Sequence, residues 1–289
     1  MARLMFSLMM LLSFHAAAEQ PTVQEHALLW RITAQHQTSP SYLFGTIHSE
    51  DARVLDLPPP VLEALNNSSR FVMEIVPDAA ASARISHRMM LPEGQSLSSV
   101  LDTKLYEQAK QAVTDKGIPA EAVERMKPWA LVMILNMPKP KSGRFLDEML
   151  YETAVHADKK TGALETPDEQ IDALDGLSMK VQIELLRQTL EHYGEIPAIT
   201  EMLIKAWLKR DLAELQRLSD LSNEGLPSDT DQLLQTRLVD ARNVRMAERM
   251  TPLVKQGGVF VAVGALHLPG ARGLIALLRK RGFEVQPVY

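Results

Sequence analysis

Two apolar segments near opposite ends of the chain carry the same short motif, a strand-like run with a glycine and, three residues later, a histidine. The runs cover residues 42–48 and 259–267, and the motif residues are Gly45 and His48 in the first, Gly264 and His267 in the second. Such β-rich runs predict buried strands, and glycine permits a sharp turn or a close backbone approach. Because ligands of open α/β sheets bind outside the carboxyl ends of strands, we expect both histidines at one edge of one sheet.

The remaining patterns divide the chain into strand-rich ends and a helical middle. Further strands are predicted at 27–32, which pairs with 42–48 as a hairpin, and at 70–76, 161–166 and 283–288. Between residues 79 and 254 most segments have the length and the glycine or proline boundaries of helices. We therefore expect an α/β protein whose mixed sheet is built from the N- and C-terminal segments, with a large inserted helical section at about 79–254.

The first 18 residues have the pattern of a signal peptide, with Arg3, an apolar run to Phe14, and alanines that end at Ala18. We expect cleavage after Ala18, which would leave residues 19–289 as a single periplasmic or secreted domain. No later stretch is apolar for long enough to span a bilayer, so no stable membrane span is expected after signal removal. The alternative for these residues is a membrane anchor left in place.

Composition excludes several classes of protein. The formal net charge is -5, and the sequence has no long basic block, which argues against nucleic-acid binding. The chain has no cysteine, so any metal site must use nitrogen and oxygen ligands. The common zincin, serine hydrolase, phosphate-loop and dinucleotide motifs do not occur. His48-Ser49-Glu50 fits the His-x-Glu of zinc deaminases, but the required Cys-x-x-Cys is absent.

Two carboxylates belong to predicted strands. Glu74 lies in the middle of one strand and Glu165 near the end of another. A buried carboxylate needs a cation, a metal or a hydrogen-bond donor nearby, because burial without a partner costs several kcal/mol. For Glu74 the alternative to a functional role is an ion pair with an arginine such as Arg70 or Arg242. For Glu165 it is a helix cap or a solvated carboxylate before Pro167.

His48, Glu74, Glu165 and His267 belong to four predicted strand ends, and together they supply the nitrogen and oxygen ligands of a hard or borderline divalent ion with an open coordination position. A metal held in this way lowers the pKa of its bound water. A carboxylate that is not itself a ligand can then serve as general base. Taken singly, each histidine could equally cap a strand or bond a buried carbonyl group.

Arg242 and Asn243 lie in a predicted helix that covers residues 231–254. A guanidinium group can grip a carbonyl or carboxylate group with two parallel hydrogen bonds. We therefore expect these two residues to hold the substrate at the sheet edge, and the alternative is an ordinary exposed helix face.

An ordered set of motifs across nearly all of the mature chain resembles the TraB/PrgY/GumN family, whose distant relatives are thought to include Tiki proteases and erythromycin esterases. The motifs are Gly45-Thr46-Ile47-His48, Met73-Glu74, Phe145-Leu146-Asp147, Leu164-Glu165-Thr166 with Glu169-Gln170, Arg242-Asn243 with Met246, and residues 264–270. The resemblance implies an α/β core around the two Gly-x-x-His elements, with His48, Glu74 and His267 in the active site. For Tiki-like members it implies divalent-metal-dependent peptide cleavage.

We therefore expect an exported metal-dependent hydrolase that acts on a peptide or on another amide or ester. In this interpretation His48, Glu74 and His267 bind a divalent ion such as Mn²⁺, Co²⁺ or Zn²⁺, and Glu165 is the general base or supports the ligands. The main alternative is a non-catalytic periplasmic binding protein that captures a peptide, a metal or haem, since the family also includes pheromone inhibitors and a haem-binding relative. A third possibility is a structural partner in an envelope assembly, in which the residues at the strand ends make only internal hydrogen bonds.

Overall fold

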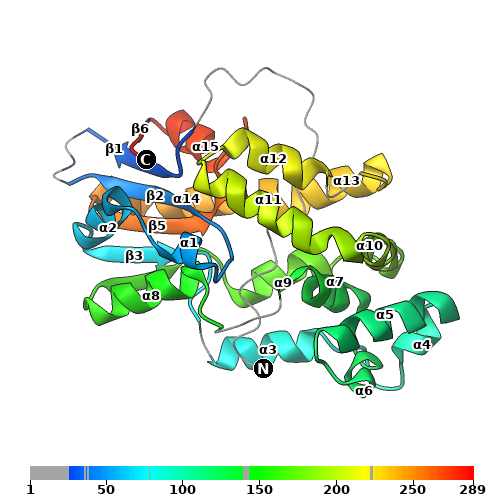
Figure 1. Cartoon of the computed structure of the whole chain (residues 1–289). Coiled ribbons are helices and arrows are strands. Elements are labelled where there is room, and N and C mark those ends of the chain that lie inside the picture. The colour runs from blue at the N-terminus through cyan, green and yellow to red at the C-terminus, as the bar shows by residue number, and fades with distance from the viewer. Residues whose placement is uncertain (1–25, 36, 38, 78, 139–142, 222–223) are drawn as a thin grey trace.

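The structure is a computed structural model that describes residues 26–35, 37, 39–77, 79–138, 143–221 and 224–289 (Figure 1). The predicted signal peptide, residues 1–18, lies outside these residues. Within the described part of the chain, no helix is long and apolar enough to cross a membrane.

A six-stranded mixed sheet forms the centre of the fold. Its spatial order is β4-β3-β5-β2-β1-β6. The strands are β1 (Leu29–Thr33), β2 (Ser41–Thr46), β3 (Arg70–Met73), β4 (Lys160–Ala163), β5 (Val259–Gly264) and β6 (Glu284–Pro287). The four strands from β4 to β2 run parallel, whereas β1 pairs antiparallel with both β2 and β6. The α/β class, the hairpin and the contribution of both chain ends to one sheet are confirmed.

Two of the helices begin with local signals that the sequence contains. Helix α2 (Pro59–Asn66) has proline at its first turn, where the missing N–H costs nothing, and α9 (Pro167–Asp175) has a capping box formed by Thr166 and Glu169. The other helices before α9 are α1 (Ala52–Leu55), α3 (Ala79–Arg88), α4 (Leu97–Val100), α5 (Thr103–Asp115), α6 (Ala120–Val123), α7 (Pro128–Asn136) and α8 (Leu146–His156).

A longer helical stretch connects β4 to β5. It contains α10 (Met179–Glu191), η1 (Tyr193–Glu195), α11 (Ile196–Leu208), α12 (Leu212–Leu221), α13 (Ser228–Leu234), the π-helix η2 (Gln235–Asp240) and α14 (Ala241–Gln256). The 3-10 turn η3 (Ala265–His267) and helix α15 (Leu274–Lys280) follow β5. The sequence predicted one helix for 231–254, and the structure divides this range into α13, η2 and α14.

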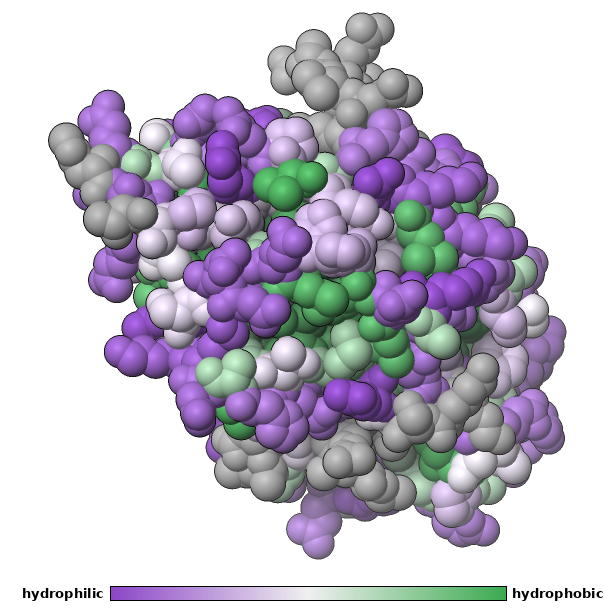
Figure 2. Space-filling view, turned by 60° about the vertical axis from the view of Figure 1, so that its left-hand side comes forward, coloured by the Kyte–Doolittle hydropathy of each residue, from purple (hydrophilic) through white to green (hydrophobic). Residues whose placement is uncertain are grey.

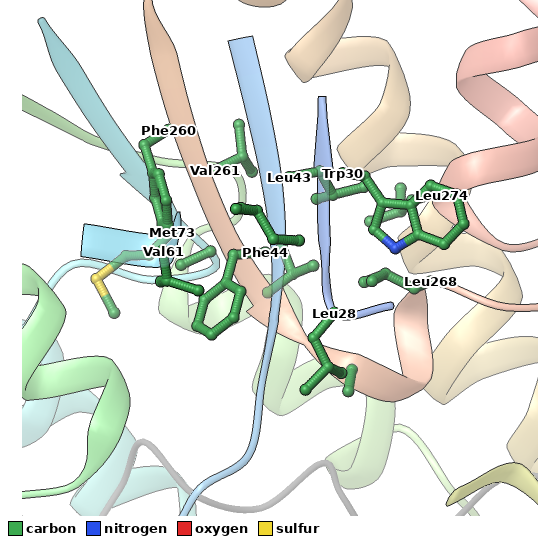
Figure 3. Packing of buried hydrophobic residues seen from close by; sticks show 14 of the residues in the cluster. Leu28, Trp30, Leu43, Phe44, Val61, Met73, Phe260, Val261, Leu268 and Leu274 are labelled. Atoms are coloured by element: carbon green, nitrogen blue, oxygen red, sulfur yellow. The ribbon is translucent and has the colours of Figure 1, made fainter. Parts of the chain in front are cut away.

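Buried side chains cover both faces of the sheet (Figure 3). Alternation along β2 directs Leu43 and Phe44 to opposite faces, and Figure 3 shows Leu43 beside Trp30, and Phe44 near Val61 and Met73. Both β2 side chains are fully buried. Two-sided burial explains why the parallel strands read as continuous apolar runs.

The helical section has a core of its own. A second cluster of buried side chains joins α5, α7, α9 and α10 and contains no residue of the sheet. By contrast α8, α11, α12 and α14 contribute to the sheet's cluster. Figure 1 shows the two parts side by side, with the sheet on the left and helices α3–α7 at the lower right. The predicted insertion at 79–254 is therefore mostly helical, but several of its helices and β4 complete the α/β core.

The face of the molecule in Figure 2 is mainly hydrophilic, with hydrophobic residues gathered near its middle. Hydrophobic residues make up 46% of the chain, and many of them are buried in the two clusters, which agrees with this view.

Candidate active site

The two Gly-x-x-His elements lie side by side at the carboxyl edge of the sheet. Strands β2 and β5 are parallel neighbours, and Thr46 is the register partner of Gly264. His48 follows two residues after Thr46, and His267 follows three residues after Gly264. Neighbouring strands are about 4.8 Å apart, so the predicted common edge for both histidines is confirmed.

The first motif needs its glycine because two backbones approach closely. A Cβ atom at Gly45 would lie 3.1 Å from Ala265 Cα and 3.0 Å from a Leu268 methyl group. Such contacts are tighter than side chains tolerate without movement. Gly45 also accepts a hydrogen bond at its carbonyl oxygen from the indole of Trp207, at 2.9 Å. The glycine thus allows β2 to pack against the turn that carries His267.

His48 is held between an aromatic ring and a carboxylate from the start of α8. Its ring stacks on Phe145, with centroids 4.0 Å apart, and only 7% of its side chain is exposed. Its Nδ1 lies 3.5 Å from Asp147 Oδ2, while the Thr46 hydroxyl donates to Asp147 Oδ1 at 2.6 Å. Leu146 N donates to Ser49 O, which ties α8 to the segment after His48.

Glu74 is the first residue after β3. The prediction that it lies in the middle of a strand is wrong, because β3 ends at Met73 and the chain bends there. Glu74 Oε1 accepts from Gly264 N at 2.8 Å, and Oε2 accepts from Arg242 Nη2 at 2.7 Å and from Gln170 Nε2 at 3.0 Å. Burial would raise the pKa of Glu74, but the charge of Arg242 and the other partners lower it to about 2. Glu74 is therefore ionised.

Glu165 lies two residues beyond the end of β4, and its side chain has no exposed surface. Its Oε2 accepts from Arg242 Nε at 2.8 Å, from Arg242 Nη2 at 2.6 Å and from Gln170 Nε2 at 3.1 Å. Its Oε1 accepts from Arg245 Nη2 at 3.0 Å. The alternative of a solvated carboxylate is excluded by this burial. Of the two predicted roles, base or supporting residue, the burial favours the supporting one.

Arg242 and Asn243 point into the protein from the first turn of α14, and both are buried. The alternative of an exposed helix face is therefore wrong. Besides the two glutamates, the Arg242 guanidinium contacts Leu238 O at 3.1 Å and His267 Nε2 at 3.0 Å. Leu238 belongs to η2, and π-helical turns often occur at functional sites. Of the two arginines proposed as ion-pair partners of Glu74, Arg70 and Arg242, the structure pairs Glu74 with Arg242.

His267 connects Arg242 to Asn243. Its Nδ1 lies 2.7 Å from Asn243 Oδ1, and Asn243 Nδ2 donates to Arg272 O at 3.0 Å. Burial, and then the adjacent charge of Arg242, lower the pKa of His267 to about 4. The imidazole is therefore neutral near pH 7.

The sequence assigned no role to Asp147 or Gln170, although both lie within the motifs of the family resemblance. Asp147 carries an acidic side chain into the first turn of α8, and Gln170 lies one helical turn after Thr166, the N-cap of α9. These placements at helix starts were the available signal. Nothing local indicated that Asp147 contacts His48, or that Gln170 bridges Glu74 and Glu165.

The predicted metal ligands do not converge on one point. Among the residues that the structure describes, no group of three or more His, Cys, Asp and Glu side chains is placed to hold a metal ion. His267 Nε2 and Glu74 Oε1 are 3.8 Å apart, but Arg242 contacts both residues. In this arrangement His48, Glu74 and His267 do not fit a shared metal, and their ligand role stays a prediction.

A comparison with known families decides the membership of the chain. The pattern of the TraB/PrgY/gumN family matches residues 28–287. The chain belongs to this family. The match covers all six strands and every site residue described above.

Three named proteins illustrate what this member of the TraB/PrgY/gumN family is similar to. The chain is similar to metalloprotease TIKI2 of Danio rerio, with 27% identity over 93% of this chain and 62% of that protein. It is 29% identical to metalloprotease TIKI1 of Homo sapiens, over 90% of this chain and 62% of that protein. It is also 25% identical to the uncharacterized protein YbaP of Shigella flexneri, over 83% of this chain and 88% of that protein. The chain thus spans less than two thirds of either TIKI protein. No solved structure matches it.

Proposed function

We propose that this protein is an exported hydrolase that cleaves a peptide, or another amide or ester, at the carboxyl edge of β2 and β5. The observation that carries the proposal is the pairing of two polar clusters at this edge. The pair of His48 and Asp147 is anchored through Thr46, and the buried network of Arg242 is anchored at Gly264, the register partner of Thr46. A proton acceptor beside a fixed charge network is what acyl-group hydrolysis requires.

His48 is the residue that we assign as proton acceptor. Asp147 Oδ2 lies 3.5 Å from its Nδ1, and a carboxylate in this position orients an imidazole ring. Water would attack the substrate carbonyl carbon while His48 takes its proton. The bond from that carbon to nitrogen or oxygen would then break, and the leaving amine or alcohol would receive the proton. Stacking on Phe145 limits rotation of the ring.

Glu74 is the network carboxylate that reaches the surface. Its side chain is 20% exposed, whereas that of Glu165 has no exposed surface. Since its pKa is about 2, Glu74 remains a carboxylate at all physiological pH values and can accept a hydrogen bond from a substrate N–H. Glu165 and Asn243 would support Arg242 and His267 from behind.

The names of the TIKI relatives imply a divalent metal for peptide cleavage. The residues of this chain do not fit that ion as arranged, because His267 Nε2 faces Arg242, His267 Nδ1 faces Asn243, and the same Arg242 guanidinium contacts Glu74. The reaction described above therefore includes no step through a metal. Metal dependence is one of the quantities that the following experiment measures.

A peptide-library cleavage assay with purified protein tests the proposal, with and without a chelator and with added Mn²⁺, Co²⁺ or Zn²⁺. We expect cleavage by the wild type and a loss of roughly 10²–10⁴-fold in His48→Ala, the usual worth of a positioned proton acceptor. Asp147→Asn should lower kcat more than it changes KM. His156→Ala is the matched control, because His156 is exposed at the far end of α8.

Two results would count against this function. Cleavage that persists in His48→Ala would remove His48 as the acceptor. Tight binding of a peptide or of haem with no turnover of any substrate would support the binding-protein alternative. Absence of both turnover and tight binding would support a structural role.

A further inference from the structure

The guanidinium group of Arg242 is fully buried, and all of its hydrogen-bonding capacity is used. Arginine has five N–H donors and no acceptor. The structure provides five contacts: Nε to Glu165, Nη2 to Glu165 and to Glu74, and Nη1 to Leu238 O and to His267 Nε2. Arg242 therefore has no N–H left for a substrate, which argues against the substrate-binding role that the sequence suggested.

The hydrogen bonds of His267 determine which ring nitrogen carries its proton. Asn243 Nδ2 donates to Arg272 O, so the Asn243 oxygen is the atom that faces His267. Because that oxygen can only accept, His267 Nδ1 carries the hydrogen and donates it. The lone pair of Nε2 then accepts from Arg242. A metal ion would need this same lone pair.

The charges around Arg242 are balanced without a metal. The two guanidinium groups of Arg242 and Arg245 face the two carboxylates of Glu74 and Glu165. A divalent ion bound to Glu74 and His267 would lie next to a buried guanidinium. Like charges this close in a protein repel strongly, so the ion and the guanidinium cannot both occupy this position.

We propose that Arg242 is the permanent cation of this cluster and occupies the position between Glu74, Glu165 and His267 that a divalent metal ion would otherwise take. Removal of the Arg242 side chain would leave two carboxylates and one imidazole around an empty space. This is an oxygen and nitrogen ligand set suited to Mn²⁺, Co²⁺ or Zn²⁺. The inference concerns metal binding alone, so it stands or falls independently of the proposed hydrolase activity.

Titration with Co²⁺, followed by calorimetry and by the visible absorption of the bound ion, tests the inference. In the wild type, the substitutions Glu74→Gln and His267→Asn should each change Co²⁺ affinity by less than about twofold. Arg242→Ala should gain one Co²⁺ site at least 100-fold tighter than any at this position in the wild type, and its melting temperature should rise with Co²⁺ concentration. Adding Glu74→Gln to Arg242→Ala should abolish that site.

Two control variants separate a created site from a general loss of positive charge. Arg249→Ala removes an arginine that is 42% exposed and pairs with Glu169, and it should gain no site. Arg242→Lys keeps a cation in the cluster and should also gain none. A gain in either control equal to that of Arg242→Ala would contradict the proposal.

The wild-type titration decides the question even if Arg242→Ala does not fold. Stoichiometric Co²⁺ binding by the wild type that is lost in both Glu74→Gln and His267→Asn would overturn the proposal, because the metal would then bind with Arg242 in place. A folded Arg242→Ala protein that gains no site would overturn it equally.

Discussion

Replacement of Glu165 by glutamine should destabilise this protein far more than removal of any surface carboxylate. The Glu165 side chain has no exposed surface and accepts hydrogen bonds from Arg242, Arg245 and Gln170. Glutamine keeps the shape but has one acceptor oxygen, so its NH₂ group would face donors on one side. Arg242 would also lose half of its buried counter-charge.

The expected magnitude follows from breaking one partner of a buried ion pair, which costs about 3–5 kcal/mol. For a domain of this size each kcal/mol shifts the melting temperature by about 2–4 °C. We therefore expect Glu165→Gln to melt roughly 6–20 °C below the wild type. The control is Glu214→Gln, because Glu214 and its partner Arg217 are 38% and 57% exposed. Exposed pairs contribute at most about 1 kcal/mol.

Thermal unfolding by circular dichroism, with urea titrations as an independent measure of the free energy of unfolding, provides the assay. Both variants would be compared with the wild type at one pH and one ionic strength. If Glu165→Gln melts no lower than Glu214→Gln, then Arg242 is not held mainly by Glu165, and the reasoning from burial is refuted.

Three further predictions concern Glu74, His267 and the chain start. Glu74→Gln should lower the free energy of unfolding by about 1–3 kcal/mol, less than Glu165→Gln, because the Glu74 side chain is 20% exposed; an equal or larger loss in urea titrations would contradict this. The pKa of His267 is about 4 in the folded protein against 6.5 as a free group, so the unfolded chain binds a proton first, and stability should be full above pH 6.5 and fall as the pH drops to 4. Urea titrations across this range should show a weaker pH dependence in His267→Asn, and an unchanged one would contradict the assignment. Mass spectrometry of protein from the cell envelope should find Glu19 as the first residue, and an intact Met1 in the membrane fraction would exclude cleavage after Ala18.

The sequence alone predicted the sheet and the edge at which the candidate site lies. The apolar runs of β2 and β5 and the glycine and histidine after them are local patterns, so they identify strand ends wherever the segments pack. The TraB/PrgY/gumN family also matches residues 28–287, which agrees with the ordered set of motifs found in the sequence. Boundaries were less certain: the run 70–76 reads as one strand, but β3 ends at Met73. The chain bends at Glu74 although the neighbouring strand β5 continues to Gly264, and alternation of side chains does not reveal that point.

Only the tertiary structure decided which charged groups meet. Arg242 lies 168 residues from Glu74 and 77 residues from Glu165 in sequence, and nothing local distinguishes it from the other arginines of α14. Its burial depends on how α14 packs into the core cluster of the sheet, and η2 directly precedes that helix. A pattern of two histidines and two carboxylates therefore suggested a metal site, whereas the folded chain brings its own cation to the same place.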